Sequence, residues 1–328
     1  MGSGVGDSVE VAWGVAWGAG WEANGGDSSP RAEGRGGPGR RAAVCYAGVM
    51  NAGESWAKIG GRRLWATVAA LLLCLALAFS ASCGAGGSGG GQDNAGGDAG
   101  PSFTFLVCGD PNGVTPQFTA VVEAAREADF LVIVGDLTPS GSESEYKRVS
   151  DFLQASGIEY YAVRGDNDRT RDPSGQVFTR YFGPLWRSFD HKGCHFQLLE
   201  DSDGFNGYPP EELAWMEEDL AAAGEGLKLA FAHIPPGAPP SLSAPYDSWE
   251  KARATSEQAL EIWRRYGVDT VFCGHLHAYM VYREADPRVL VTGGAGSPLH
   301  LPEAMGGYYH YLRVTVRGGA VDVEVVRL

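Results

Sequence analysis

The chain has 328 residues, enough for one large domain or two ordinary ones, and its 48 glycines are concentrated in the first hundred residues. A formal net charge of −14 argues against nonspecific nucleic-acid binding, which needs a basic surface. An anionic substrate remains compatible with this charge, because bound cations can outweigh nearby carboxylates. None of the six cysteines forms a CxxC pair, so neither a zinc ribbon nor a disulfide framework is indicated.

The first hundred residues are predicted to form three segments ahead of a globular domain. Residues 1–49 are rich in Gly, Ala, Arg and Ser; they are interpreted as disordered or as upstream sequence that the mature protein lacks, with Met50 as the start. Residues 50–82 are predicted to be a signal peptide, because a basic stretch precedes an apolar run, 64–79, that is too short to span a bilayer comfortably. Residues 83–100 form a Gly/Ser-rich tether that cannot bury enough surface to fold.

The apolar run ends in Ser80-Ala81-Ser82-Cys83-Gly84. Small residues leading to a cysteine resemble a bacterial lipobox, and this resemblance implies that Cys83 becomes a lipidated N-terminus. Ser80 stands where the lipobox usually has an aliphatic residue, so ordinary cleavage near Ser82 and an uncleaved anchor stay open as alternatives. We therefore expect an extracytoplasmic domain that is anchored to the membrane as a lipoprotein, or alternatively one that is secreted.

Residues 101–328 are expected to fold as one domain with two sheets. Strands are predicted at 103–108, 130–134 and 158–164, with helices at 115–128 and 142–155 between them. This β-α-β-α-β alternation indicates a mixed or parallel sheet with covering helices. The later strands are predicted at 186–189, 195–199, 227–231, 268–272, 279–283, 289–292, 308–316 and 321–326, and the later helices at 210–223 and 254–266.

Potential metal ligands follow five of the predicted strands. In chain order they are Asp110 with Asn112, Asp136, the cluster Asp166-Asn167-Asp168, His233, and the pair His275 and His277. A single Gly-Asp after a strand is more often a cap or a turn, but five such strand ends make coincidence a poor explanation. Open α/β sheets place ligands at the carboxyl ends of strands, and mixed oxygen and nitrogen donors favour Mn, Fe, Zn or Co over calcium.

The order of these motifs resembles that of the calcineurin-like metallophosphoesterases, and of their purple-acid-phosphatase-like members in particular. The resemblance covers 103–328, with support from the helix over 210–220 and the motif over 266–279. It implies a four-layer α/β/β/α sandwich of two mixed sheets. It also implies metal-dependent hydrolysis of a phosphate ester by metal-bound hydroxide at a two-metal centre.

The resemblance also assigns ligands to each of two metal ions, which are expected to be divalent or trivalent. The first ion takes Asp110, Asp136 and His277, and the second takes Asp136 again with Asp166, His233 and His275. Asp136 therefore bridges the two ions.

Three residues depart from the family pattern. Asn112 stands where many members have a histidine, so the first ion is expected to bind more loosely. Asp166 stands where an asparagine is usual, and its charge either weakens phosphate attraction or favours a trivalent ion such as Fe³⁺ at the second position. Asn167 replaces a histidine that is often assigned as general acid or as transition-state stabiliser. Because an amide cannot shuttle a proton, we expect a preference for leaving groups of low pKa.

Further roles are predicted around the metal ligands. Asn167 and Asp168 are candidate catalytic residues, and Arg169 and His300 are candidate substrate-binding residues. For Arg169, a phosphate contact and a surface salt bridge are weighted equally. His300 and His310 are both considered as substitutes for the missing acid, although the alternating pattern around His310 favours a structural role.

Several other polar side chains have alternative interpretations. Arg164 and Arg171 are further candidate partners for phosphate, whereas His191 and His195 are expected at the solvent or at a sheet edge. Cys108 and Cys273 are interpreted as small buried side chains, with a disulfide between neighbouring strands as the alternative in an oxidising compartment.

Two functions from different classes fit the sequence. The first is a lipid-anchored phosphohydrolase acting on a small phosphate ester, and the second is a phosphate- or nucleotide-binding lipoprotein that no longer turns over. The three departures motivate the second, whereas Asp136 and the histidines favour the first. Monoester, diester, nucleotide and phospholipid head group all remain open as substrates, because specificity lies in loops such as 201–208 and 241–249.

Overall fold

The computed structural model describes residues 102–241 and 244–328. The upstream segment, the signal peptide, the lipidation site Cys83 and the tether all lie outside the described residues, so they remain predictions from the sequence. Within the described part of the chain, no helix is long and apolar enough to cross a membrane.

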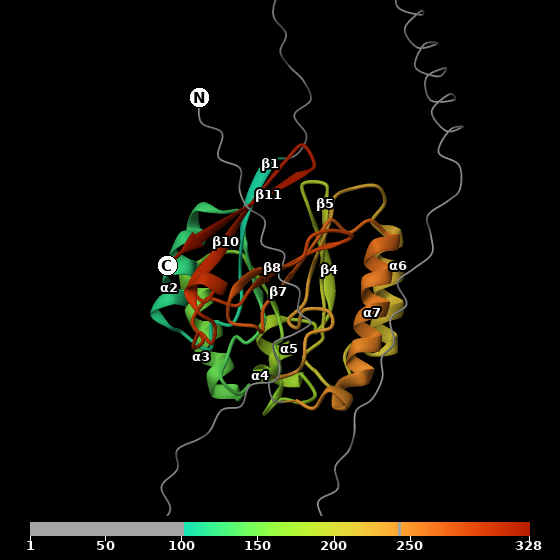
Figure 1. The fold of residues 1–328 in the computed structure, drawn as a ribbon. Helices are drawn as coiled ribbons and strands as arrows, with labels where there is room; N and C mark the ends of the chain where they lie inside the picture. The colour runs from blue at the N-terminus through green and yellow to red at the C-terminus, as the bar shows by residue number, and fades with distance from the viewer. Residues whose placement is uncertain (1–101, 242–243) are drawn as a thin grey trace, which may run out of the picture. The chain divides into compact units, whose positions relative to one another are not determined.

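The first sheet contains five strands in the order β11-β10-β1-β2-β3 (Figure 1). Its strands are β1 (Ser102–Cys108), β2 (Leu131–Val134), β3 (Tyr160–Val163), β10 (His310–Arg317) and β11 (Ala320–Arg327). The pairs β1–β2 and β2–β3 are parallel, whereas β10 is antiparallel to both β1 and β11. The carboxyl ends of β1, β2 and β3 therefore meet at one edge of this sheet.

The second sheet contains six strands in the order β4-β5-β6-β7-β9-β8. Its strands are β4 (Arg187–His191), β5 (Cys194–Leu198), β6 (Lys228–Phe231), β7 (Thr270–Cys273), β8 (Tyr279–Arg283) and β9 (Arg288–Thr292). Neighbours from β5 to β9 are parallel, and β4 and β8 are antiparallel at the two edges. Both sheets are thus mixed, as the sequence predicts.

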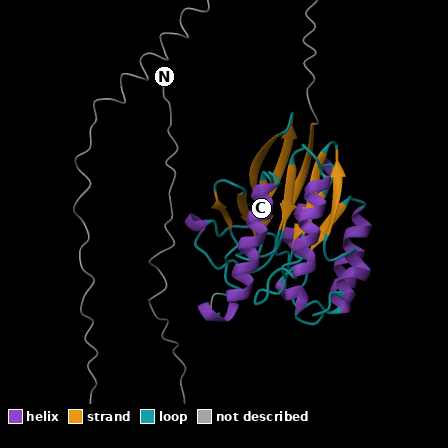
Figure 2. Ribbon diagram, turned by 90° about the vertical axis from the view of Figure 1, so that its right-hand side faces the viewer, coloured by secondary structure: helices purple, strands orange, loops and turns teal. Residues whose placement is uncertain are grey.

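Helices cover the outer face of each sheet, and Figure 2 shows them outside the strands. The first sheet is covered by α2 (Pro116–Ala124), α3 (Glu143–Ser156) and α5 (Gln176–Phe182), and the second by α6 (Pro210–Ala222) and α7 (Glu250–Arg265). The predicted four-layer α/β/β/α sandwich is confirmed.

An aromatic core fills the space between the two sheets. Phe105 and Phe130 from the first sheet pack with Phe196, Phe231 and Phe272 from the second, and all five are buried. The ring of Phe105 lies 5.0 Å from that of Phe130 and 5.5 Å from that of Phe196. This core sets the two sheets face to face, so that strand ends from both contribute to one site.

Two short helices in the first half are missed by sequence reasoning. They are α4 (Asp166–Arg169) and α5, of four and seven residues. The ends of α3 are easier to recognise in the sequence than those of α4 and α5. Ser142 and Glu145 form a capping box, and Gly157 adopts the left-handed conformation that ends the helix.

The position of His195 corrects the prediction of an edge or solvent location. Its side chain is only 8% exposed, with Nδ1 2.8 Å from Asp190 Oδ1 and Nε2 3.0 Å from Asp219 Oδ2. Burial acts to lower the pKa of His195, but the hydrogen bonds to Asp219 and Asp190 outweigh it and raise the pKa. Both ring nitrogens face carboxylates, so the charged imidazolium is the form that the fold favours.

His195→Gln is expected to destabilise the protein more at pH 6 than at pH 9. The folded pKa of His195 is raised, so its contribution is fully present below the unfolded value of about 6.5 and is lost as pH rises through the folded pKa. We expect a loss of roughly 1–3 kcal/mol at pH 6, as for hydrogen bonds to a charged group. Urea unfolding of both proteins in the presence of a chelator measures this difference. A loss that is equal at the two pH values, or larger at pH 9, would contradict it.

Candidate metal centre

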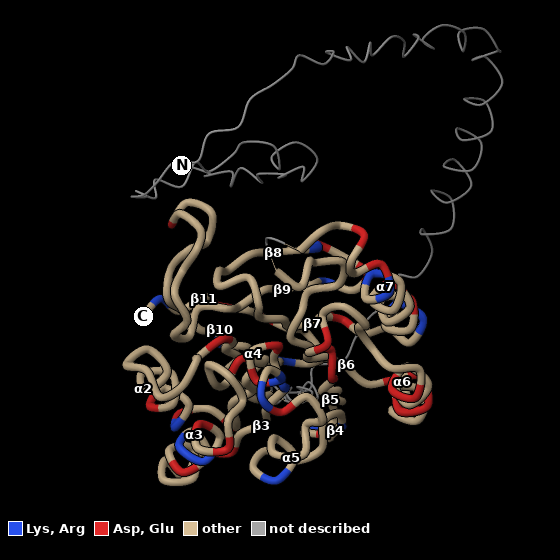
Figure 3. Tube along the Cα trace, turned by 90° about the horizontal axis from the view of Figure 1, so that it is seen from below, with Lys and Arg blue, Asp and Glu red and all other residues tan. Residues whose placement is uncertain are grey.

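The carboxyl ends of five strands bring the predicted ligands together. Asp110, Asp136 and Asp166 follow β1, β2 and β3, and His233 and His275 follow β6 and β7. Figure 3 shows the protein from this side, with α4 and its acidic residues near the centre. The site therefore draws carboxylates from one sheet and imidazoles from the other.

The first ligand group consists of Asp110, Asp136 and His233. One donor atom from each residue lies within 4.8 Å of the others, and all three residues are buried. His277 extends this group, with Nε2 3.3 Å from Asp110 Oδ1. The backbone N–H of His275 donates to both carboxylate oxygens of Asp110, at 3.1 and 3.0 Å, which holds this side chain toward the second sheet.

The second ligand group consists of Asp166, His233 and His275, which also lie within 4.8 Å of one another. Asp166 Oδ1 is 2.8 Å from His233 Nε2 and 3.0 Å from His275 Nδ1. His233 Nε2 is also 3.4 Å from Asp136 Oδ1, so the two groups are continuous. The six ligands that the resemblance assigns thus form a single cluster.

Each of the three imidazoles has one nitrogen held by a backbone carbonyl. The pairs are His233 Nδ1 with Val134 O at 2.9 Å, His275 Nε2 with Pro239 O at 2.9 Å, and His277 Nδ1 with Pro298 O at 2.8 Å. In a neutral ring the nitrogen beside a carbonyl carries the proton, so the lone pair of the other nitrogen points at the carboxylates. Such orientation by a second hydrogen bond is typical of metal-ligating histidines.

The backbone of the site is held in a conformation that side chains disfavour. Asp110, Asn112, Asp136, His275 and His277 all have positive φ, between 44° and 70°. A non-glycine residue there costs of order 1–3 kcal/mol and persists where the surrounding fold fixes it, which is common at functional sites.

Glycines beside the ligands permit their close approach. A Cβ at Gly135 would overlap the ring of His233, and one at Gly165 would overlap Asp136. The Gly-Asp motifs at these strand ends therefore serve packing as well as turn geometry.

Asn112 supplies a test of whether this donor set fits a metal. Its Oδ1 atom is buried and has no hydrogen-bond partner among the described residues. A buried acceptor without a donor costs free energy, and most buried polar atoms in proteins are satisfied. Asn112 lies two residues after Asp110, and its backbone N–H donates to Asp136 O at 2.9 Å, so a cation bound by these two aspartates would have this acceptor on the same loop. The residues therefore fit a metal centre at this position.

The electrostatics of the cluster point the same way. Burial raises the pKa of Asp136 well above its usual value, and the neighbouring Asp110 and Asp166 add to this, although His233 opposes it. Burial acts to raise the pKa of Asp166 too, but hydrogen bonds from His233 and His275 hold it below its usual value. Three carboxylates packed around buried imidazoles repel one another, and cations would offset that repulsion.

Asn167 lies against Asp136, whereas Asp168 does not face the site. The backbone N–H and side-chain amide of Asn167 donate to the two oxygens of Asp136, at 2.9 and 2.7 Å. Asp168 is fully buried and accepts hydrogen bonds from the backbone N–H groups of Leu137, Thr138 and Gly165 and from the Thr138 hydroxyl. Burial raises the pKa of Asp168 to about 6. The catalytic role predicted for Asp168 is replaced by a structural one, because the side chain ties the loop after β2 to the loop after β3.

Two of the three arginines of this region, Arg164 and Arg169, are already paired in the structure. Arg164 is buried and forms two hydrogen bonds with Glu200, at 2.8 and 3.1 Å, so the predicted phosphate contact by Arg164 is wrong. Arg169 Nη2 lies 2.6 Å from Asp203 Oδ2, with a third of the Arg169 side chain exposed. Of the two roles predicted for Arg169, a phosphate contact and a surface salt bridge, the structure shows the salt bridge.

His300 lies beside the metal ligands, whereas His310 does not. The exposed ring of His300 stacks on that of His277, with centroids 4.8 Å apart and an interplanar angle of 21°. Burial and the neighbouring His277 lower the pKa of His300. His310 is fully buried between Thr292 and Tyr308, which agrees with the structural role favoured from its strand pattern.

Cys108 and Cys273 are buried free thiols, and burial raises the pKa of each thiol. They lie on β1 and β7, which belong to different sheets. A disulfide between neighbouring strands is therefore excluded for this pair.

Asp201 supports the site and is missed by sequence reasoning. Its two oxygens accept the backbone N–H groups of His233 and Ile234, at 2.8 and 2.9 Å, and burial raises the pKa of Asp201 to about 6. The only local signal is an acidic pair, Glu200-Asp201, shortly after β5. The sequence around Glu200 and Asp201 matches no motif, because Arg164 and His233, which they contact, are more than 30 positions away along the chain.

Comparison with known proteins places these observations in context. Residues 103–279, more than half of the chain, match the calcineurin-like phosphoesterase family. Tartrate-resistant acid phosphatase type 5 of Homo sapiens is 23% identical over 288 residues, covering 69% of this chain and 85% of that protein. A probable cyclic nucleotide phosphodiesterase of Fibrobacter succinogenes is 23% identical over 180 residues, covering 52% of this chain and 66% of that protein.

The structure resembles that of a plant enzyme. Purple acid phosphatase PPD1 from yellow lupin aligns with a TM-score of 0.55 at 14% sequence identity, covering 70% of this chain and 52% of the lupin chain. At this level of identity the likeness supports the fold. The chain spans about half the length of the lupin enzyme.

Proposed function

The chain belongs to the calcineurin-like phosphoesterase family, and we propose that it hydrolyses phosphate esters at a two-metal centre. The observation that carries this proposal is the pair of ligand groups, Asp110/Asp136/His233 and Asp166/His233/His275, which share one buried histidine. Relatives named as phosphatases and phosphodiesterases support a phosphate ester as the substrate class.

Each ion has its own ligands in this proposal. Asp110, His277 and the unpartnered oxygen of Asn112 would hold the first ion, and Asp166, His233 and His275 would hold the second. Asp136, which belongs to the first ligand group, is assigned to both ions. Mn, Fe, Zn or Co suit this mixture of oxygen and nitrogen donors.

When bound, two such ions would neutralise phosphoryl oxygens and lower the pKa of water, which is the chemistry that phosphate-ester hydrolysis needs near neutral pH. The protein's own groups orient and position the ligands. Backbone carbonyls fix the three imidazoles, and Asp201 fixes the loop that carries His233. Asn167 contributes N–H donors beside Asp136 but no transferable proton, so the leaving group departs as an anion unless solvent protonates it.

Aryl phosphates are therefore expected to react faster than alkyl phosphates. General acid catalysis typically contributes 10²–10⁴-fold, so an alkyl ester without such an acid should be slower by about 10²-fold or more. Measuring kcat/KM for aryl and alkyl monoesters and diesters on the Mn²⁺- or Fe-loaded protein tests this expectation. Equal rates would contradict the role given to Asn167. Full metal loading without turnover of any ester would favour the phosphate-binding alternative.

The proposal also includes the membrane tether that the sequence predicts over residues 50–100. These residues lie outside the described part of the chain, and mass spectrometry of the mature N-terminus for a lipid on Cys83 tests the tether directly.

A further inference from the structure

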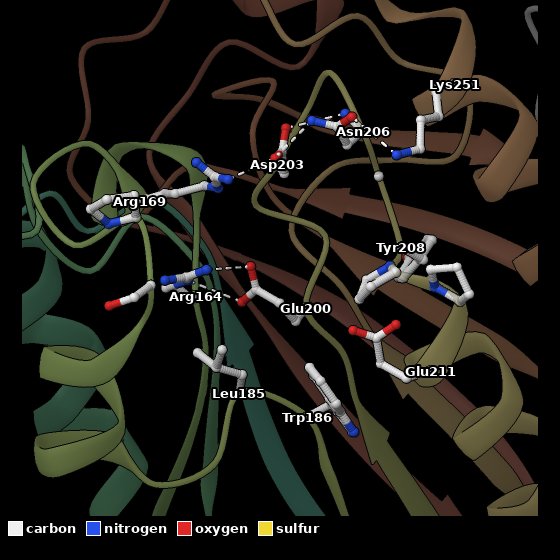
Figure 4. Close-up of a pocket in the computed structure, with 15 residues that line it drawn as sticks. Arg164, Arg169, Leu185, Trp186, Glu200, Asp203, Asn206, Tyr208, Glu211 and Lys251 are labelled. Atoms are coloured by element: carbon white, nitrogen blue, oxygen red, sulfur yellow. Dashed lines mark hydrogen bonds and ion pairs between the residues drawn. The ribbon is translucent and has the colours of Figure 1, made fainter.

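A cavity of about 330 Å³ is lined by residues of two segments that also carry or support the proposed metal ligands (Figure 4). Arg169, which lines it, is one helical turn after Asp166 in α4. Asp203, which faces Arg169, is two residues after Asp201, the side chain that holds the backbone of His233. Two walls of the cavity are thus continuous with the segments that position the metal ligands.

Four of the six charged side chains that line this cavity are paired with one another, and the other two are Glu211 and Lys251. The floor is the buried pair of Arg164 and Glu200, whose guanidinium also donates to Asp172 O at 2.8 Å. Arg169 is paired with Asp203. Such a lining does not favour a second anionic group, so the cavity suits the uncharged organic part of a phosphate ester.

Opposite Arg169 and Asp203, Leu185 and Trp186 supply apolar surface to the cavity. Trp186 is half-buried and lies with Leu185, and Pro173, Pro209 and Pro210 complete the apolar lining. In Figure 4, Leu185 and Trp186 lie opposite Arg169 and Asp203, with the Arg164–Glu200 pair between them. A flat ring would stack on the indole of Trp186, because aromatic surfaces pack well against one another.

The side of the cavity that carries Asp203 also offers hydrogen-bonding groups from Asn206 and Lys251. Lys251 Nζ lies 3.2 Å from Asn206 Oδ1, and Asn206 Nδ2 donates to Asp203 Oδ2 at 3.0 Å. These three exposed or half-exposed side chains present both donors and acceptors, as hydroxyl groups require. The cavity volume of about 330 Å³ is at the lower end of the 300–1,000 Å³ range of ligand sites, so the cavity accommodates one small organic group.

We propose that this cavity binds the nucleoside part of a nucleotide substrate. The base stacks on Trp186, the ribose hydroxyls lie near Asp203 and Asn206, and the phosphate is directed toward the ligands that begin at Asp166. This inference rests on the proposed function for the phosphate position alone, because nucleoside binding in the cavity needs no metal.

Calorimetric titration of the full chain with adenosine, guanosine, cytidine and uridine tests the proposal. At least one nucleoside is expected to bind, and Trp186→Ala should weaken that binding about tenfold, which is the usual effect of losing one base–aromatic stack. Trp186→Phe should restore it to within about threefold. The matched control is Trp215→Ala, because Trp215 is half-buried on α6 and does not line the cavity; it should leave binding unchanged.

Three results would overturn the proposal. The first is that none of the four nucleosides binds. The second is that Trp186→Ala, shown by circular dichroism to have a native fold, binds the nucleoside as tightly as the unchanged protein. The third is that ribose 5-phosphate binds as tightly as the matching nucleoside 5′-monophosphate. Failure of the cavity and failure of the catalytic proposal are distinguishable. Nucleoside binding without ester hydrolysis contradicts only the catalytic proposal, whereas hydrolysis of aryl phosphate without nucleoside binding contradicts only the cavity.

Discussion

Asp136→Ala is expected to lose both metal ions, together with phosphate-ester hydrolysis. Its carboxylate belongs to the first ligand group, with Oδ1 3.4 Å from Nε2 of His233, the histidine shared with the second group, and both oxygens are held by Asn167. Residues that only orient a ligand typically cost 10–100-fold in metal affinity when they are changed. A shared ligand should cost more than about 100-fold at each position.

Single-site variants provide the matched comparison for Asp136. His277→Gln is expected to lose the first ion and keep the second, because His277 approaches only Asp110 among the carboxylate ligands. His275→Gln should do the reverse, because its ring contacts Asp166. Elemental analysis of metal per chain, alongside kcat/KM, distinguishes the three variants. Retention of one tightly bound ion by Asp136→Ala would show that Asp136 does not bridge.

Arg164→Met is expected to lower the free energy of unfolding by about 3–5 kcal/mol, because it leaves the Glu200 carboxylate buried without its partner. Both side chains are less than a tenth exposed, and the guanidinium makes two hydrogen bonds to Glu200 and one to Asp172 O. For a folded region of this size the loss corresponds to a fall in Tm of roughly 6–20 °C.

A double variant and a surface variant make this prediction specific. Arg164→Met combined with Glu200→Met should recover much of the lost stability, because no unpaired charge stays buried. Arg265→Met removes an arginine that pairs with Glu217 on the surface, where the two side chains are 53% and 40% exposed respectively. This change should alter the free energy of unfolding by less than about 1 kcal/mol. Thermal and urea unfolding compare all three. A loss from Arg164→Met no larger than that from Arg265→Met would contradict a structural role for the buried pair.

The fold and the grouping of the candidate metal ligands were predictable because both depend on local patterns. Short apolar runs ending in Gly-Asp or Gly-His identify β1, β2 and β7 and the ligand after each of them. Parallel strands place such ends at one edge of a sheet, so the proximity of Asp110 and Asp136 follows from the pattern. His275 reaches Asp110 only because the two sheets pack face to face.

The roles of the surrounding polar residues were not predictable in this way. Arg164 pairs with a residue 36 positions away, and Asp168 bonds to residues 30 and 31 positions away. His195 is held by Asp219, 24 positions along the chain. Each contact depends on how strands and helices pack, and no spacing in the sequence encodes it. Short helices such as α4 are missed for a related reason, because four residues contain no helical periodicity.

A crystal of the protein soaked with Mn²⁺, with data collected to locate manganese by anomalous scattering, tests the two-metal centre most directly. We expect two peaks, roughly 3.5–4 Å apart as in other two-metal sites. One peak should contact Asp110 and His277, the other should contact Asp166 and His275, and the carboxylate of Asp136 should reach both. A single peak at saturating Mn²⁺, or two peaks of which only one contacts Asp136, would contradict the account.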